Sequence, residues 1–167
     1  MKMIATAFCV CISLCCVAQE VLQEVRNLYS AAGRVQDSAT KMFKLLRPVD
    51  SHSSPILQCY KGAVIMVGAK YSINPFRKFS AFSNGKKQVE KAIQRDSNNV
   101  EMHYIRFTLQ TNLPSFLGYH DNINNDKEYI ISQYRFIQDA TLRSIIAAYF
   151  RVCSYCTGND VKRLNNG

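Results

Sequence analysis

The sequence predicts an all-α fold, an antiparallel array of about seven helices joined by short connections. Apolar residues recur at helical spacing through most of the chain, and Gly, Pro, Asn and Asp mark the breaks between these stretches. No segment offers two alternating strands joined by a hairpin turn. With no tryptophan, seven glycines and four prolines, the composition also disfavours collagenous, low-complexity and most all-β classes.

The first half of the chain beyond residue 18 predicts four helices. The first covers residues 20–32 and stops at Gly33, and the second starts at Asp37 or Ser38 and closes before Pro48. These two helices are therefore joined by only a few residues, which favours antiparallel neighbours.

The third and fourth helices are separated by a strong break signal. The third spans residues 55–71, with a proline suited to its first turn, and the fourth spans residues 76–95 after Asn74-Pro75. Gly85 lies inside the fourth helix and costs about 1 kcal/mol relative to Ala. A break near Gly85 is therefore an alternative to one continuous helix.

A fifth helix, residues 100–110, follows a dense turn and N-cap signal at residues 96–99. At 100° per residue its apolar side chains fall on two opposed sides, Val100, Tyr104 and Phe107 on one and Met102, Ile105 and Leu109 on the other. A helix that is apolar on two sides is expected to lie between neighbours in the core.

The last third of the chain predicts two more helices and a tail. The polar stretch 121–126 leads to a helix over residues 127–137, and Asp139 caps a helix that ends near Val152. The polar residues that follow are expected to fray. The domain prediction is therefore a signal peptide at 1–18, a helical-hairpin domain at 19–156 and a flexible tail at 157–167.

Residues 1–18 have the pattern of a signal peptide. Lys2 is followed by an uncharged apolar run, and the small residues Cys16 and Ala18 stand at the −3 and −1 positions of a signal peptidase site. We expect cleavage between Ala18 and Gln19 and a periplasmic or extracellular address. No later apolar run is long enough for a transmembrane segment in the mature chain.

Two alternatives to cleavage concern the same segment. A non-cleaved anchor would need a longer apolar run than this one. A lipoprotein would need a small residue before the lipidated cysteine, whereas Leu14 precedes Cys15. Because the segment meets neither requirement, cleavage after Ala18 is favoured over a membrane anchor and over a lipoprotein.

The length of 167 residues corresponds to about one domain, and a hydrophobic fraction of 47% is ordinary for a globular chain. These values disfavour a multidomain protein and a disordered chain. The excess of 21 Lys+Arg over 12 Asp+Glu gives a net charge of +9, which favours acidic or anionic partners.

Four of the seven cysteines lie within residues 1–18, which leaves Cys59, Cys153 and Cys156. Three cysteines are too few for a disulfide framework. Cys153 and Cys156 form a CxxC pattern at a helix C-terminus, where the helix dipole has the wrong sign to favour a thiolate. A local disulfide or two unpaired thiols is therefore favoured over redox catalysis or a zinc site.

Two short patterns resemble known families. Gly85-Lys86-Lys87, Glu90 to Ile93 and Asp96 to Glu101 resemble the second helix and turn of a tetratricopeptide hairpin, in which a proline commonly stands at the position of Ser97. A second resemblance, over roughly residues 55–150, is to a group of small exported proteins of Bacteroidota-type bacteria. Its motifs are Tyr60-Lys61-Gly62-Ala63, Asn74-Pro75, Asn98-Asn99-Val100-Glu101, Ile105-Arg106-Phe107, Asn112 to Tyr119, Asn122-Ile123 and Asp126-Lys127. The resemblance implies a tetratricopeptide-like right-handed array of helical hairpins and an envelope address, and it implies no activity.

Arg106 places a charge on the helix expected between two apolar neighbours. If Arg106 is buried it requires a carboxylate, and Asp126 or Glu128 on the next helix is the nearest along the chain. Alternatively, Arg106 faces a groove with Tyr119 and His120 and binds a ligand carboxylate or phosphate. A structural ion pair is the favoured interpretation.

The positive charge is concentrated in one part of the chain. Residues 53–99 contain eight basic residues against Glu90 and Asp96, and the candidate anion patch among them consists of Arg77, Lys78, Lys86 and Lys87. In the same segment Phe76, Phe79 and Phe82 recur every three residues, and this spacing predicts an apolar stripe that faces the core.

No metalloprotease, nucleophile-elbow, P-loop or dinucleotide motif occurs, so no catalytic residue, metal or cofactor is predicted. The expected function is an exported, non-enzymatic scaffold or adaptor that binds a protein or peptide in a helical-repeat groove. The first alternative is binding of anionic envelope lipid or glycan through the basic patch, and the second is an enzyme of unknown class. Nucleic acid is not an expected partner, because an exported protein seldom meets it.

Overall fold

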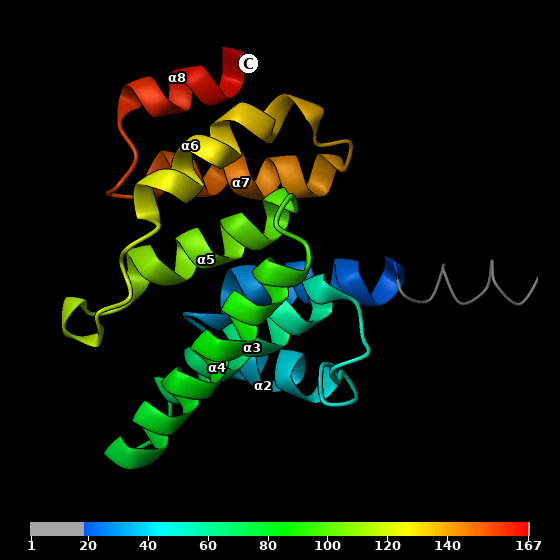
Figure 1. Cartoon of the computed structure of the whole chain (residues 1–167), viewed down its shortest axis with the longest axis vertical. Coiled ribbons are helices and arrows are strands. Elements are labelled where there is room, and N and C mark those ends of the chain that lie inside the picture. Colours follow the sequence, from blue (N-terminus) through cyan, green and yellow to red (C-terminus); the bar gives the residue numbers. More distant parts are fainter. Residues whose placement is uncertain (1–18, 167) are drawn as a thin grey trace, which may run out of the picture.

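A computed structural model describes residues 19–166, and these residues form α-helices, short 3-10 helices and connecting turns without a strand (Figure 1). The all-α prediction is confirmed for this part of the chain. The predicted signal peptide, residues 1–18, lies outside the described residues. Residues 19–32 are helical and are followed by α2 (Gln36–Leu45), α3 (Pro55–Ala69), α4 (Pro75–Arg95), α5 (Val100–Asn112), η1 (Ser115–Leu117), α6 (Ile123–Gln133), η2 (Tyr134–Phe136), α7 (Ala140–Val152) and α8 (Gly158–Asn166).

Helix α5 lies between two apolar clusters, as its two-sided pattern predicts. Met102, Ile105 and Leu109 belong to a core formed with the helix at 19–32 and with α2, α3 and α4. Tyr104 and Phe107, from the other side of α5, belong to a second core formed with α6, α7 and α8. Helix α5 therefore joins the two halves of the molecule (Figure 1).

Helices α3 and α4 pack closely along much of their length, because two glycines face each other. A Cβ atom on Gly85 would lie 2.5 Å from the carbonyl oxygen of Gly62, and one on Gly62 would lie 2.7 Å from that of Gly85. Helix α4 is continuous over its 21 residues, so the alternative of a break at Gly85 is wrong. Gly85 is required for close packing of the two backbones.

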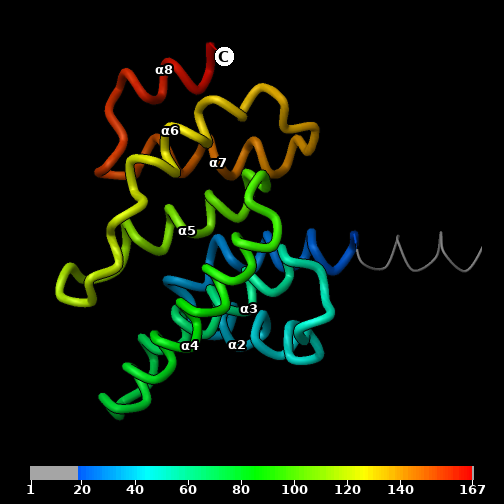
Figure 2. The backbone as a smooth tube through the Cα atoms, viewed as in Figure 1, coloured from blue at the N-terminus to red at the C-terminus, as the bar shows by residue number. Residues whose placement is uncertain are grey.

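The phenylalanine stripe of α4 is only partly in the core. Phe82 is 9% exposed, whereas Phe76 and Phe79 are 85% and 67% exposed, so the prediction of a core stripe is wrong for these two. The reason is tertiary: the first turns of α4 extend beyond the helices that would cover them, at the end of the α3–α4 hairpin remote from α5–α8 (Figure 2).

In the last third of the chain, the start of one helix and the presence of another differ from the sequence prediction. Helix α6 begins at Ile123, earlier than the predicted 127, because Ile123 and Asp126 are buried against α5. Residues 158–166 form α8 where the sequence predicts a flexible tail. The start of α8 is a capping box in which the Thr157 hydroxyl accepts from the Asp160 amide and the Asp160 carboxylate accepts from the Thr157 amide.

Candidate functional site

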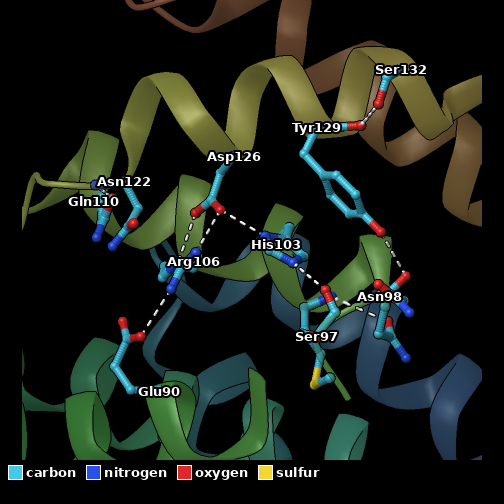
Figure 3. Close-up of polar contacts among 12 residues, drawn as sticks. Glu90, Ser97, Asn98, His103, Arg106, Gln110, Asn122, Asp126, Tyr129 and Ser132 are labelled. Carbon is cyan, nitrogen blue, oxygen red and sulfur yellow. Dashed lines mark hydrogen bonds and ion pairs between the residues drawn. The ribbon is translucent and has the colours of Figure 1, made fainter. Parts of the chain in front are cut away.

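The Arg106 side chain bridges three helices through two carboxylates (Figure 3). Its Nε and Nη2 donate to Asp126 of α6 at 2.8 and 2.7 Å, and its Nη1 donates to Glu90 of α4 at 2.9 Å. Burial acts to lower the pKa of Arg106, but the hydrogen bonds and charges of Asp126 and Glu90 outweigh it and raise that pKa. Arg106 is therefore a permanent cation with both of its counter-ions inside the protein.

Tyr119 and His103 complete this network. The Tyr119 hydroxyl donates to Glu90 at 2.5 Å, and burial followed by this hydrogen bond raises the pKa of Tyr119. His103 Nδ1 lies 2.7 Å from Asp126 Oδ1, the same oxygen that accepts from Arg106 Nη2, while Oδ2 accepts from Arg106 Nε (Figure 3). His120 lies outside the network, with its Nε2 3.3 Å from the carbonyl oxygen of Leu113.

The network fits the structural interpretation of Arg106. Asp126 is 1% exposed, and the donors of Arg106 are already directed at protein carboxylates. Glu128, the other carboxylate considered, pairs with Arg163 at the surface. Arg106 pairs with Asp126, the favoured of the two interpretations, and Tyr119 joins them through Glu90, whereas His120 does not. These side chains hold helices together and leave no donor set open to a ligand.

A second buried network involves residues that the sequence analysis did not single out. Arg26 donates to both oxygens of Glu101 at 2.6 Å and also to Asp139 of the α7 N-cap. The Tyr60 hydroxyl donates to Glu101 at 2.7 Å. The available signal was Glu101 itself, a second charge on a helix predicted to be buried on two sides, which requires a cation.

An open groove lies between α2, α3 and α4. It has a volume of about 890 Å³ and is lined by Ala39, Phe43, Val64, Ile65, Ala69 and Ala81, with other small and polar residues. Phe43 is 50% exposed, so an aromatic side chain at the groove is only half covered. Arg77 and Lys87 also line it and make it an apolar groove with two cations.

The four residues of the predicted anion patch do not share one face of α4. Arg77 and Lys87 line the groove, whereas Lys78 does not. Lys86 faces elsewhere, with its Nζ 4.7 Å from the ring centroid of Tyr119. The patch is therefore two separate features, a cationic groove wall and cations on other faces.

Residues 51–89 contain no Asp or Glu, so α3 and most of α4 have no acidic residue of their own. At the end of their hairpin three large apolar side chains are exposed, Ile73 at 99%, Phe76 at 85% and Phe79 at 67%. Lys70, Arg77 and Lys78 lie within the same short segment. We call Ile73, Phe76 and Phe79 the hairpin tip.

Neither a protein-family model, nor a curated protein, nor a solved structure matches this chain. Within residues 19–166, no helix combines the length and the apolar character needed to cross a bilayer. Among the same residues, His, Cys, Asp and Glu side chains form no group of three or more placed to hold a metal ion.

Proposed function

We propose that this chain is a non-enzymatic scaffold or adaptor that holds a peptide segment of a partner protein in the groove between α2, α3 and α4. The observation that carries the proposal is the groove itself, about 890 Å³ of space with an apolar lining and two cationic side chains. Helical proteins commonly bind extended or helical segments in grooves between their hairpins.

The groove selects for a partner segment with apolar and acidic side chains. Phe43, Val64 and Ile65 offer apolar contact, and Arg77 and Lys87 offer charge complementarity to carboxylates. No Asp or Glu occurs between residues 51 and 89 to neutralise these cations locally. A basic partner would therefore be repelled, and an acidic one attracted.

Site-specific photocrosslinking tests this proposal. Benzoylphenylalanine is placed at Thr40, which lines the groove and is exposed, and in a control chain at Ser132, an exposed residue of α6 outside the groove. We expect a discrete protein adduct in the native host from Thr40 and none from Ser132, with the crosslinked partner peptide rich in acidic and apolar residues.

A matched pair of charge reversals makes the test specific. Arg77→Glu with Lys87→Glu should abolish the adduct, whereas Lys41→Glu with Lys44→Glu, on exposed positions of α2 outside the groove lining, should leave it. Identical adducts from both crosslinker positions, or insensitivity to the groove reversal, would contradict the proposal.

A second candidate function is binding to an anionic lipid surface through the hairpin tip. Exposed apolar side chains beside unneutralised cations fit a bilayer interface, where rings enter the headgroup region and cations meet phosphates. The apolar tip also favours lipid over glycan. Salt-sensitive binding to vesicles containing phosphatidylglycerol, lost in Phe76→Ser with Phe79→Ser, would support it; equal binding by that variant would exclude it.

The exported address and the right-handed tetratricopeptide-like arrangement belong to the same proposal. An adaptor in the periplasm or outside the cell is consistent with the apolar run of residues 1–18. Mass spectrometry of the N-terminus of the protein from its host distinguishes a chain beginning at Gln19 from a longer or lipidated one.

A further inference from the structure

The two cysteines of the CxxC pattern lie at opposite ends of a tight surface turn between α7 and α8. The Cys156 amide donates to the Cys153 carbonyl at 3.0 Å, which closes a four-residue turn through Ser154 and Tyr155. Such a turn holds its first and last Cα atoms within about 7 Å of each other. A disulfide spans Cα separations of about 4.4–6.8 Å, so the backbone already suits a bond between these two sulfurs.

The N-terminus of α8 brings a second helix dipole near the motif, and it acts at Cys156 rather than at Cys153. Cys153 follows the C-terminus of α7, where the dipole disfavours a thiolate, but Cys156 precedes the N-terminus of α8 by two residues. The motif thus lies between the ends of two helices, with opposite effects on a thiolate.

Hydrogen-bond donors gather around Cys153. The Cys156 thiol is the largest influence that lowers the pKa of Cys153, and the Tyr155 amide and the hydroxyls of Tyr149 and Thr111 act in the same direction. The same contact with Cys153 raises the pKa of Cys156. The charged groups that face Cys156, Lys127 and Asp160, form an ion pair of their own at 3.2 Å.

The cysteine pair is approached from solvent at the exposed turn that joins its two members. Ser154 and Tyr155 are exposed and Cys156 is half-buried, whereas Cys153 is 9% exposed. Cys59, the other cysteine of the described residues, is fully buried in the core around α3. Among the cysteines of the described residues, Cys156 is therefore the most accessible, Cys153 offers a small exposed surface beside it, and Cys59 offers none.

We propose that Cys153 and Cys156 are a reversible dithiol–disulfide site that exchanges with small disulfides of the glutathione type. The Cys153 thiolate attacks one sulfur of the small disulfide, breaks its S–S bond and releases one thiol. Cys156 then loses its proton and attacks the sulfur of Cys153, which forms the protein disulfide and releases the second thiol. Two electrons and two protons pass to the small disulfide, which becomes two thiols.

The site goes beyond the proposed binding function, because it lies in the α7–α8 half of the molecule and shares no residue with the groove. The disulfide would tie the C-terminus of α7 to the start of α8. Oxidation would thereby fix the turn that positions α8 against α6 and α7.

Redox equilibration of the full chain tests the proposal. The protein is incubated at a series of ratios of reduced to oxidised glutathione, quenched in acid, alkylated with N-ethylmaleimide and digested with trypsin. Cleavage after Arg151 and Lys162 releases residues 152–162, which contain Cys153 and Cys156 and no other cysteine. We expect this peptide to change from doubly alkylated to internally disulfide-linked in one reversible transition.

Two variants serve as controls. Cys156→Ser should convert the oxidised product into a glutathione mixed disulfide on Cys153, and Cys59→Ser should leave the transition unchanged. The proposal is overturned if the wild-type peptide stays doubly alkylated at every ratio, if it accumulates only mixed disulfides, or if its disulfide does not return to thiols in excess reduced glutathione.

Discussion

Arg106 and Asp126 form a two-pronged ion pair between α5 and α6, with Nε–Oδ2 and Nη2–Oδ1 distances of 2.8 and 2.7 Å. The third nitrogen of the same guanidinium bonds Glu90 of α4. Helix α4 belongs to one apolar cluster and α6 to the other, so this cation links both halves of the molecule across α5.

Replacing Arg106 with Met should destabilise the protein by about 3–5 kcal/mol, because Asp126 then remains buried without its guanidinium partner and with only His103 beside it. Arg163→Met is the matched control, since its pair with Glu128 is 44% and 52% exposed and solvent screens it, so its loss should be much smaller. Urea unfolding followed by circular dichroism measures both. Equal losses in the two variants would contradict a structural role for Arg106.

Gly85→Ala should destabilise the α3–α4 hairpin by about 1–3 kcal/mol, because the new Cβ would overlap the Gly62 carbonyl oxygen and Met66. Gly68→Ala is the control within the same hairpin, where an added Cβ meets no atom within 4 Å and helix propensity improves. The thermal midpoints of the two variants should therefore move in opposite directions. A stable Gly85→Ala chain would show that the two helices can separate without cost.

Phe82→Ala should cost about 3–5 kcal/mol of unfolding free energy, because its ring is buried and packs edge-on against Tyr119. Phe76→Ala, six residues earlier on the same helix, should change stability by less than about 0.5 kcal/mol, because its ring is exposed. Denaturant midpoints compare the two. A large loss from Phe76→Ala would place that side chain in a packed environment and remove the basis of the hairpin tip.

As the pH falls, α8 should unfold locally before the α3–α4 hairpin does. Hydrogen bonds from the Thr157 amide lower the pKa of Asp160 against the opposing effect of burial, and the Thr157 hydroxyl and Lys127 lower it further. Because the pKa of Asp160 is lower in the folded state, ionised Asp160 stabilises the fold fully above its unfolded-state pKa of about 3.9. This stabilisation is lost as the pH falls through the folded-state pKa.

Amide hydrogen exchange, normalised to the intrinsic rate at each pH, checks this order. Protection of residues 158–166 should fall below about pH 4 while that of residues 55–69 persists. Asp160→Ala should weaken α8 by about 1 kcal/mol already at neutral pH, as loss of a capping residue does. Equal protection of α8 at pH 3 and pH 6 would contradict the assignment.

Alkylation kinetics should distinguish the two turn cysteines. The hydrogen bond from Cys156 lowers the pKa of Cys153 to about 6, so its thiolate fraction and its rate with iodoacetamide should rise through that pH and level off above it. Limiting reagent at pH 7, followed by fragmentation of the 152–162 peptide, should find Cys153 labelled before Cys156. Labelling of Cys156 first would reverse the assigned roles. Tyr149→Phe should raise the pH at the midpoint of the Cys153 alkylation profile, because it removes a hydrogen bond that lowers the pKa of Cys153.

Much of the helical order was readable from local signals. Asn99 and Asp139 accept hydrogen bonds from Met102 and Leu142 as N-caps, where the sequence predicts helix starts. The two apolar faces of α5 likewise correspond to two clusters. These features could be predicted because a helix cap and an apolar helix face each depend only on residues within one or two helical turns.

Other features escaped sequence analysis because they depend on distant partners. Arg26 and Glu101 are 75 residues apart, so nothing local predicts their pairing. The α8 helix was missed because its polar sequence is stabilised by its capping box and by Leu164, which is 1% exposed in the core of α6 and α7. Thr157 followed three residues later by Asp160 was the available signal.

The sequence by itself determined the all-α class, the caps, the two-sided α5 and the concentration of charge between residues 53 and 99, because each follows from helical spacing and composition. Only the tertiary structure decided which of those charges and phenylalanines remain at the surface. Burial depends on which helices lie above a residue, so Phe82 is covered while Phe76 is not, and Arg77 lines a groove while Lys86 lies on Tyr119. The proposed binding groove is therefore a property of how α2, α3 and α4 pack, which the spacing of residues along one helix does not contain.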